Sequence, residues 1–194
     1  GWHNAGDLNK YANISCRSVY ALYVLARKAT QLGLNDSIRG IIVDEGLWGS
    51  EFLYKMCMPG KGLIYEEVWD GYGYWGQPEL HKDNIPGTDD DRPVRGISPS
   101  AMTAAALAAA ARETGRSDYR MAAEKLWRTA VDSLHIDREE IWLDKDSLGR
   151  LIRMTADLLM ADIELEAVTG DKRYTKEAHI HADSLIAYQE PDGW

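Results

Sequence analysis

A short motif occurs twice in this sequence, and it constrains the fold more than any other feature. The first copy, Thr-Gly-Arg-Ser-Asp-Tyr, covers residues 114–119, and the second, Thr-Gly-Asp-Lys-Arg-Tyr, covers residues 169–174. Each copy follows an apolar pattern typical of a helix and precedes another helical pattern. A glycine directly after a helical pattern ends the helix. Repetition of one helix-turn-helix unit indicates an α-solenoid or a closed α/α toroid.

Helices are predicted over most of the chain. In the first of them, apolar residues recur at the i, i+3, i+4 and i+7 spacing until Gly33. Ser98 and Pro99 suit the N-cap and the first position of a third helix, and its alanine-rich run at 104–111 permits close approach of neighbouring helices. The predicted helices cover residues 14–32, 37–57, a segment opening at 98–99, 117–134, 147–168 and 175–189. The fold class is therefore all-α, with alternate helices expected to face a common axis.

The first seven residues, Gly-Trp-His-Asn-Ala-Gly-Asp, concentrate side chains that suit chemistry better than packing. Trp2, His3, Asn4 and Asp7 bring an indole, an imidazole, a carboxamide and a carboxylate together, and Gly6 permits a tight turn between them. A loop that displays polar groups in this way is a candidate site. The alternative is that Asn4 and Asp7 cap the helix that follows.

The helical period disappears between residues 60 and 97. Residues 62–69 alternate well enough to predict a short strand, and glycines and prolines then punctuate a long loop. A long loop without secondary structure is usually functional or disordered, and its aromatic content argues against disorder. Tyr72, Tyr74 and Trp75 stand among glycines and offer faces on which sugar rings can stack. Tyr65 and Trp69 are the better candidates for a small core, and all five aromatic residues could instead pack there.

The composition indicates one globular domain that does not bind nucleic acid. The chain has 194 residues, 45% of them hydrophobic, and 22 basic against 31 acidic residues give a net charge of −9. This balance argues against nucleic acid or an anionic membrane as a partner and favours a neutral ligand. There is no apolar run long enough to span a membrane and no signal-peptide pattern.

The sequence opens inside a motif, so we expect a piece of a longer chain. Cys16 and Cys57 are expected to be small buried hydrophobic residues.

Several blocks of the sequence, in the same order, resemble glycoside hydrolase family nine, the inverting cellulases built on an α/α toroid. Residues 1–7, followed by Lys10 and Tyr11, are similar to the family signature Gly-Trp-x-Asp-Ala-Gly-Asp, with Asn4 in place of the first acid. The other matching blocks are Trp-Gly-Ser-Glu-Phe-Leu-Tyr-Lys-Met at 48–56, Val-Trp-Asp-Gly at 68–71, Tyr-Trp-Gly-Gln-Pro-Glu at 74–79, Arg-Pro at 92–93 and the alanine-rich run. An Asp-His pair that many members place before the loop tryptophan is missing.

The resemblance implies hydrolysis of β-1,4-linked glucan by single displacement. It makes Asp7 the general base, with Asn4 keeping the size and one acceptor oxygen of an aspartate but not its charge. It also implies sugar binding by Trp2, His3 and the three loop aromatics Tyr72, Tyr74 and Trp75. The family's general acid is a glutamate near the C-terminus of the catalytic domain, and none of Glu66, Glu67 and Glu79 matches it. Residues 1–194 are therefore expected to be part of a single toroid domain, incomplete at its C-terminus, with the remainder of the domain as partner.

The resemblance also bears on cofactors and location. Many members bind a structural calcium ion through an Asp-Glu pair ahead of the second Thr-Gly turn, where this chain has Ala156 and Asp157. Loss of one carboxylate weakens a site for a hard cation, so no metal site is assigned and no cofactor is required, while a weakened structural calcium site stays open. The acidic run at 89–91 is a weaker cation candidate, and His135, His179 and His181 are expected to be solvated or capping. An extracellular or periplasmic location is implied.

Two other functions stay open. One is a carbohydrate-binding relic, which keeps the aromatic groove but has lost turnover because Asn4 replaces an acid. The other is a helical-repeat interaction module whose loop aromatics form a core.

Overall fold

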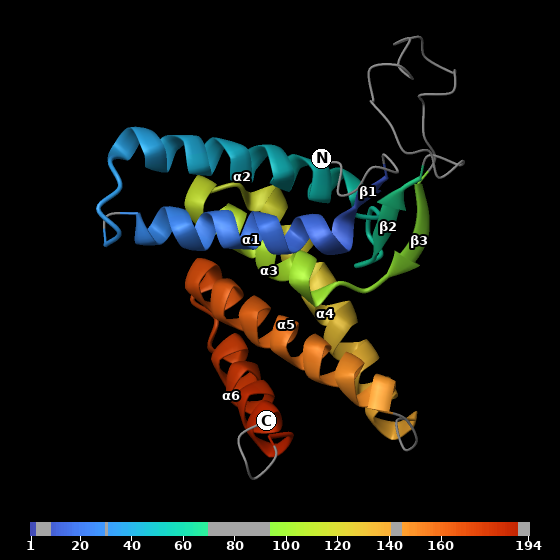
Figure 1. Ribbon diagram of the computed structural model, residues 1–194. Helices are drawn as coiled ribbons and strands as arrows, with labels where there is room; N and C mark the ends of the chain where they lie inside the picture. Colours follow the sequence, from blue (N-terminus) through green and yellow to red (C-terminus); the bar gives the residue numbers. More distant parts are fainter. Residues whose placement is uncertain (3–8, 30, 70–93, 141–144, 190–194) are drawn as a thin grey trace.

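The computed structural model describes residues 1–2, 9–29, 31–69, 94–140 and 145–189, with the backbone alone described for 135–140 and 145–147. The described part contains six helices and a three-stranded sheet (Figure 1). In chain order the elements are β1 (Lys10–Tyr11), α1 (Ala12–Lys28), α2 (Asp36–Met56), β2 (Ile64–Val68), β3 (Val94–Ser98), α3 (Ala101–Thr114), α4 (Ser117–Glu140), α5 (Lys145–Thr169) and α6 (Lys172–Ala187). The predicted all-α class and its six helices are confirmed.

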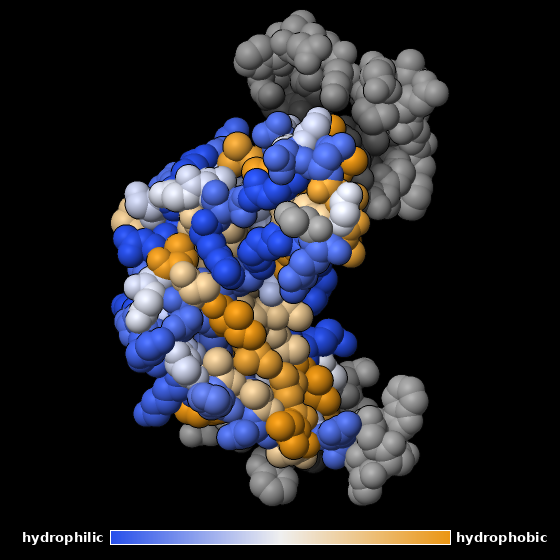
Figure 2. All heavy atoms as spheres, turned by 90° about the vertical axis from the view of Figure 1, so that its left-hand side faces the viewer, coloured by the Kyte–Doolittle hydropathy of each residue, from blue (hydrophilic) through white to orange (hydrophobic). Residues whose placement is uncertain are grey.

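The helices form two layers. α1, α3 and α5 make up one layer, in which α3 packs against both α1 and α5. α2 covers α1, α4 covers α3 and α5, and α6 covers α5. Alternate helices therefore share a layer, as the repeat predicted. In the space-filling view the described residues outline an arc that is hollow on one side and carries a band of apolar side chains between hydrophilic ones (Figure 2).

The two copies of the repeated motif form the same turn. Gly115 and Gly170 adopt φ angles of 73° and 71°, a left-handed conformation that favours glycine. The amide of each glycine donates to the carbonyl four residues earlier, at Ala111 and Glu166, over 2.8 Å in both cases. The closing tyrosine of each copy, at 119 and 174, is fully buried. The interpretation of the repeat as a helix-ending turn is confirmed.

α3 lies at the centre of the core. Every residue from Ala101 to Ala111 is buried, because the small side chains let α1 and α5 approach closely. The predicted cap of this helix was wrong. Ser100 is the N-cap, and its hydroxyl accepts a 3.1 Å hydrogen bond from the amide of Thr103. Ser98 is not free to cap the helix because it pairs with Ile64 in the sheet.

A three-stranded antiparallel sheet, in the order β1-β2-β3, closes one end of the helices. β2 confirms the strand predicted over 62–69. β3 corrects the prediction that the whole stretch to residue 97 is loop. Its sequence, Val-Arg-Gly-Ile-Ser, is short and has a glycine at φ 66° in the middle. The alternation of apolar and polar residues that predicts a strand is therefore weak in it. Pairing with β2 makes it a strand.

α1 also ends earlier than the apolar pattern predicted, at Lys28 rather than near residue 32. The carbonyl of Ala29 accepts from the amides of both Leu32 and Leu34, at 3.1 and 2.9 Å. These bonds turn the chain before Gly33, which adopts a φ of 71° within the connection.

Buried carboxylates of α5 join it to the surrounding helices. Asp162 is fully buried, and its two oxygens contact Nδ1 of His181 and Nε1 of Trp127, each at 2.6 Å. Glu164, also buried, bonds Arg27 at 2.5 Å and Arg112 at 3.4 Å. The expectation that His181 is solvated was wrong, because its partner lies on another helix. His179 is exposed, as expected, and the side chain of His135 lies outside the described residues.

The two cysteines are free. Cys16 is buried and Cys57 is half-buried, and burial raises the pKa of these thiols to about 11 and about 12. Both therefore stay protonated at neutral pH and behave as small apolar side chains, which is what the sequence predicted for them. Within the described residues, no helix has the length and apolar content needed to cross a membrane.

Candidate functional site

The residues predicted for the site fall mostly in two segments that the structure does not describe. His3, Asn4 and Asp7 lie within 3–8, and Tyr72, Tyr74 and Trp75 lie within 70–93. Their roles stay predictions. Trp2 is described, as are the residues that flank both segments, so the structure shows what anchors them.

The sheet brings the ends of the two segments together. Lys10 in β1 pairs with Val68 in β2, and Val68 also pairs with Val94 in β3. Residues 3–8 therefore rejoin the described chain, and residues 70–93 leave and rejoin it, at the same end of one small sheet (Figure 1). This juxtaposition of the polar motif and the aromatic loop was not visible in the sequence, because it depends on strand pairing between residues far apart in the chain.

Asn9 follows the polar motif and is a buried polar residue that sequence reasoning missed. Its side chain is 4% exposed, and Nδ2 donates a 2.9 Å hydrogen bond to the hydroxyl of Tyr11. A buried amide that lacked a partner would cost stability. The bond therefore holds the chain between the motif and α1 in one conformation.

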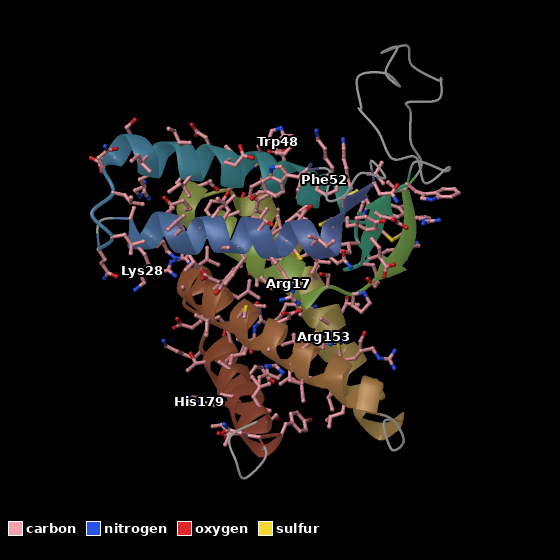
Figure 3. All side chains as sticks on the ribbon, viewed as in Figure 1. Arg17, Lys28, Trp48, Phe52, Arg153 and His179 are labelled. Atoms are coloured by element: carbon pink, nitrogen blue, oxygen red, sulfur yellow. The ribbon has the colours of Figure 1, made fainter. Side chains whose placement is uncertain are left out.

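Trp2 anchors the beginning of the motif on α2. Its ring meets the ring of Trp48 edge to face, with centroids 5.5 Å apart and an interplanar angle of 60°. Its Nε1 donates a 2.6 Å hydrogen bond to the carboxylate of Glu45. Figure 3 shows Trp48 and Phe52 on the part of α2 that receives the N-terminus. The block at 48–56, one of the matching blocks of the sequence, therefore seats this tryptophan.

Gly49 provides the space for Trp2. A Cβ atom at position 49 would lie 2.2 Å from the Trp2 ring and 2.6 Å from a methyl group of Val19, and neither distance is tolerable. Position 49 is thus a glycine because Trp2, 47 residues earlier in the sequence, packs against it.

We expect Gly49→Ala to displace Trp2 and to destabilise the protein by about 1–3 kcal/mol, the usual cost of overpacking. Gly40→Ala is the matched control, because Gly40 lies in the same helix with no atom within 4 Å of an added Cβ. The control should stabilise the helix by roughly 0.5–1 kcal/mol. Urea unfolding gives both values, and near-UV circular dichroism reports the Trp2–Trp48 pair. Equal effects of the two substitutions would show that Gly49 is not reserved for Trp2.

Two of the hollows on the described surface are lined in part by residues of α2. One, of about 490 Å³, runs beside Trp2 and is lined by Ser18, Ala21, Leu22, Leu25 and Glu45. The other, of about 470 Å³, lies between the end of α2 and α4 and includes Tyr54, Met58, Leu63 and Met121. Only the first contains a residue predicted for the site.

Tyr65 and Trp69 lie where the aromatic loop meets the sheet. Tyr65 is half-buried and packs against the core, as predicted. Trp69 is also half-buried, but the guanidinium of Arg95 stacks over its ring, 4.2 Å from the centroid. Arg95 also pairs with Glu67 on the neighbouring strand. The ion pair and the stacking together hold the end of β2 and Trp69 against β3.

In the described part of the chain, no group of three or more His, Cys, Asp or Glu side chains is placed to hold a metal ion. Asp157, which the resemblance places at a calcium site, bonds Arg17 at 3.0 Å instead. Burial raises the pKa of Asp157, and the charge and hydrogen bond of Arg17 oppose that rise. The acidic run at 89–91 lies outside the described residues.

Comparison with known proteins gives a consistent result. A family model described as glycosyl hydrolase family 9 matches residues 1–193. No curated protein matches the chain. Endoglucanase CelQ from Clostridium thermocellum, in a crystal structure with cellotriose, is similar over 98% of this chain, with a TM-score of 0.70 and 17% identity. A metagenome-derived family 9 endoglucanase is similar over 97% of the chain, with a TM-score of 0.63 and 27% identity.

An endoglucanase from the termite Nasutitermes takasagoensis is similar over 96% of the chain, with a TM-score of 0.61 and 22% identity. The similar region is only part of each of these proteins. It makes up 31% of the CelQ chain, 36% of the metagenome-derived enzyme and 45% of the termite enzyme. The chain thus spans less than half the length of each of the three.

Proposed function

This chain belongs to glycosyl hydrolase family 9, and from that premise we propose that it forms part of a glycoside hydrolase that cleaves β-1,4-linked glucan. Two observations support the substrate class. CelQ, which shares the fold of this chain, has been crystallised with cello-oligosaccharides. The chain itself carries three aromatic residues among glycines at 72–75, and flat aromatic faces suit the apolar faces of sugar rings.

The proposed reaction is an inverting single displacement. Asp7 takes a proton from water as the water attacks the anomeric carbon, and Asn4 accepts a hydrogen bond from the same water without adding charge. A glutamate outside residues 1–194 protonates the departing glycosidic oxygen. In an inverting enzyme the two carboxyl groups stand about 6.5–9.5 Å apart, which leaves room for the water.

The observation that carries the proposal is the position of the sheet. Because Lys10 pairs with Val68 and Val68 pairs with Val94, the segment with Asp7 and the segment with Trp75 are both attached at the same end of the sheet. A base and a sugar platform tethered in this way can serve one bound glucan chain. Trp2, fixed on α2 by Trp48 and Glu45, holds the other end of the polar segment. The remainder of the catalytic domain supplies the general acid, and the family's polymeric substrate suggests an extracellular or periplasmic location.

Binding of cello-oligosaccharides tests the proposal. We expect isothermal titration calorimetry of the protein with cellotetraose to show saturable binding, which Trp75→Ala weakens roughly tenfold, equivalent to ~1.4 kcal/mol. His179→Ala is the control, since His179 is an exposed ring on α6 far from the sheet (Figure 3). It should bind as the unmodified protein does. No binding by the unmodified protein would contradict the proposal and favour the helical-repeat module.

A carbohydrate-binding relic is the second candidate, and the asparagine at position 4 favours it. Saturable binding by a protein that releases no reducing sugar, even with the remainder of the domain present, would select the relic over the hydrolase.

A further inference from the structure

The ion pair between Arg17 and Asp157 joins two helices across a third. Arg17 lies near the start of α1 and Asp157 in the middle of α5, and Nη2 of the arginine is 3.0 Å from Oδ2 of the aspartate. Nη1 of the same guanidinium lies 3.9 Å from Sδ of Met102 in the first turn of α3. The arginine therefore contacts α3 while it reaches α5 (Figure 3).

The aspartate in this pair needs a cation. Its side chain is only 15% exposed, and a carboxylate held away from water is costly unless a positive charge or hydrogen bonds compensate it. Arg17 provides both, because its guanidinium is always charged and donates hydrogen bonds in a fixed plane. Arg153, one turn earlier on α5, contributes a favourable charge without a direct ion pair to Asp157 among the described contacts.

The described side chains around Asp157 do not fit a calcium ion. Calcium takes six to eight oxygen ligands, of which carboxylates are the usual core. Position 156, which would carry the second carboxylate, is alanine. The guanidinium that binds Asp157 has a thioether beside it, since Nη1 of Arg17 lies 3.9 Å from Sδ of Met102. A thioether sulfur is not a ligand for a hard cation.

We propose that the guanidinium of Arg17 takes the place of the calcium ion that the resemblance implies at Asp157, so that the described residues join α1 to α5 there without a divalent metal. The arrangement matters for the site because α1 directly follows β1, and β1 is the first element after the polar motif. A covalently attached cation cannot be removed by a chelator or diluted away. The junction therefore does not respond to calcium concentration.

Calcium chloride alone and EDTA are the probes for this proposal. We expect the thermal midpoint of the unmodified protein to be the same in millimolar calcium chloride and in excess EDTA, and calorimetry with calcium chloride to show no saturable heat. We expect Arg17→Met, which keeps an unbranched stem beside Met102, to lower the midpoint by about 2–4 °C. Arg17→Lys should lower the thermal midpoint by a smaller amount, because lysine keeps the charge but not the planar guanidinium.

Arg153→Met is the matched control. It removes an exposed arginine that acts on the same aspartate only at longer range, and it should shift the midpoint less than Arg17→Met does. A calcium-dependent rise in the midpoint of the unmodified protein, or saturable calcium binding, would overturn the proposal. So would equal midpoints for Arg17→Met and Arg153→Met. If Arg17→Met cannot be purified folded, the calcium measurements on the unmodified protein still decide.

Discussion

Replacing Asp7 with asparagine is expected to lower kcat by about 10²–10⁴-fold, the usual contribution of general acid–base catalysis. The substitution keeps the size of the side chain and an acceptor oxygen but removes the carboxylate that we propose takes the proton from water. Because the loss lies in the chemical step, KM for a soluble cello-oligosaccharide should change little. Initial rates of reducing-sugar release, measured with the remainder of the catalytic domain present, give both constants.

Asp132→Asn is the control for this experiment. Asp132 is an exposed aspartate on α4, and its loss should leave kcat unchanged. An Asp7→Asn variant that keeps the rate of the unmodified protein would remove Asp7 from the mechanism.

Asn4→Asp tests the other polar position of the motif, because a second carboxylate orients the water but also raises the pKa of one member of the pair. A gain in rate at neutral pH would show that the missing carboxylate at position 4 lowers the activity.

The parts of the fold that the sequence predicted correctly are those set by local interactions. The turn at Gly115 and its copy at Gly170 are short-range structures, since a glycine in the left-handed region and a carbonyl four residues earlier define both. The burial of α3 follows from its alanine content. The helix ends were less accurate, because the bonds that end α1 form within the connection itself.

The parts that the sequence did not predict depend on partners far away in the chain. Val94–Ser98 is a strand because β2 pairs with it, and its own five residues carry little pattern. Gly49 reads as an ordinary helical glycine until the ring of Trp2 is placed against it. For the same reason, the sequence could suggest both the polar motif and the aromatic loop but could not show that one sheet tethers them together.

His181 is the clearest of these cases, and it leads to the largest expected effect on stability. We expect Asp162→Ala to destabilise the protein by about 2–6 kcal/mol, because it leaves two buried partners unsatisfied and each such group costs about 1–3 kcal/mol. Asp162 accepts from Trp127 and contacts His181, all three side chains are buried, and they come from α5, α4 and α6. Alanine would leave the indole N–H and an imidazole nitrogen without a partner and would open a void between the three helices.

Asp183→Ala provides the comparison, since Asp183 is an exposed aspartate on α6 two residues from His181. Surface substitutions of this kind usually change stability by no more than about 0.5 kcal/mol. Asp162→Asn should fall between the two alanine variants, because the amide keeps the volume and one oxygen that can accept from Trp127. Urea unfolding monitored by far-UV circular dichroism measures all three. If Asp162→Ala unfolds at the same urea concentration as Asp183→Ala, the buried aspartate does not hold α4, α5 and α6 together.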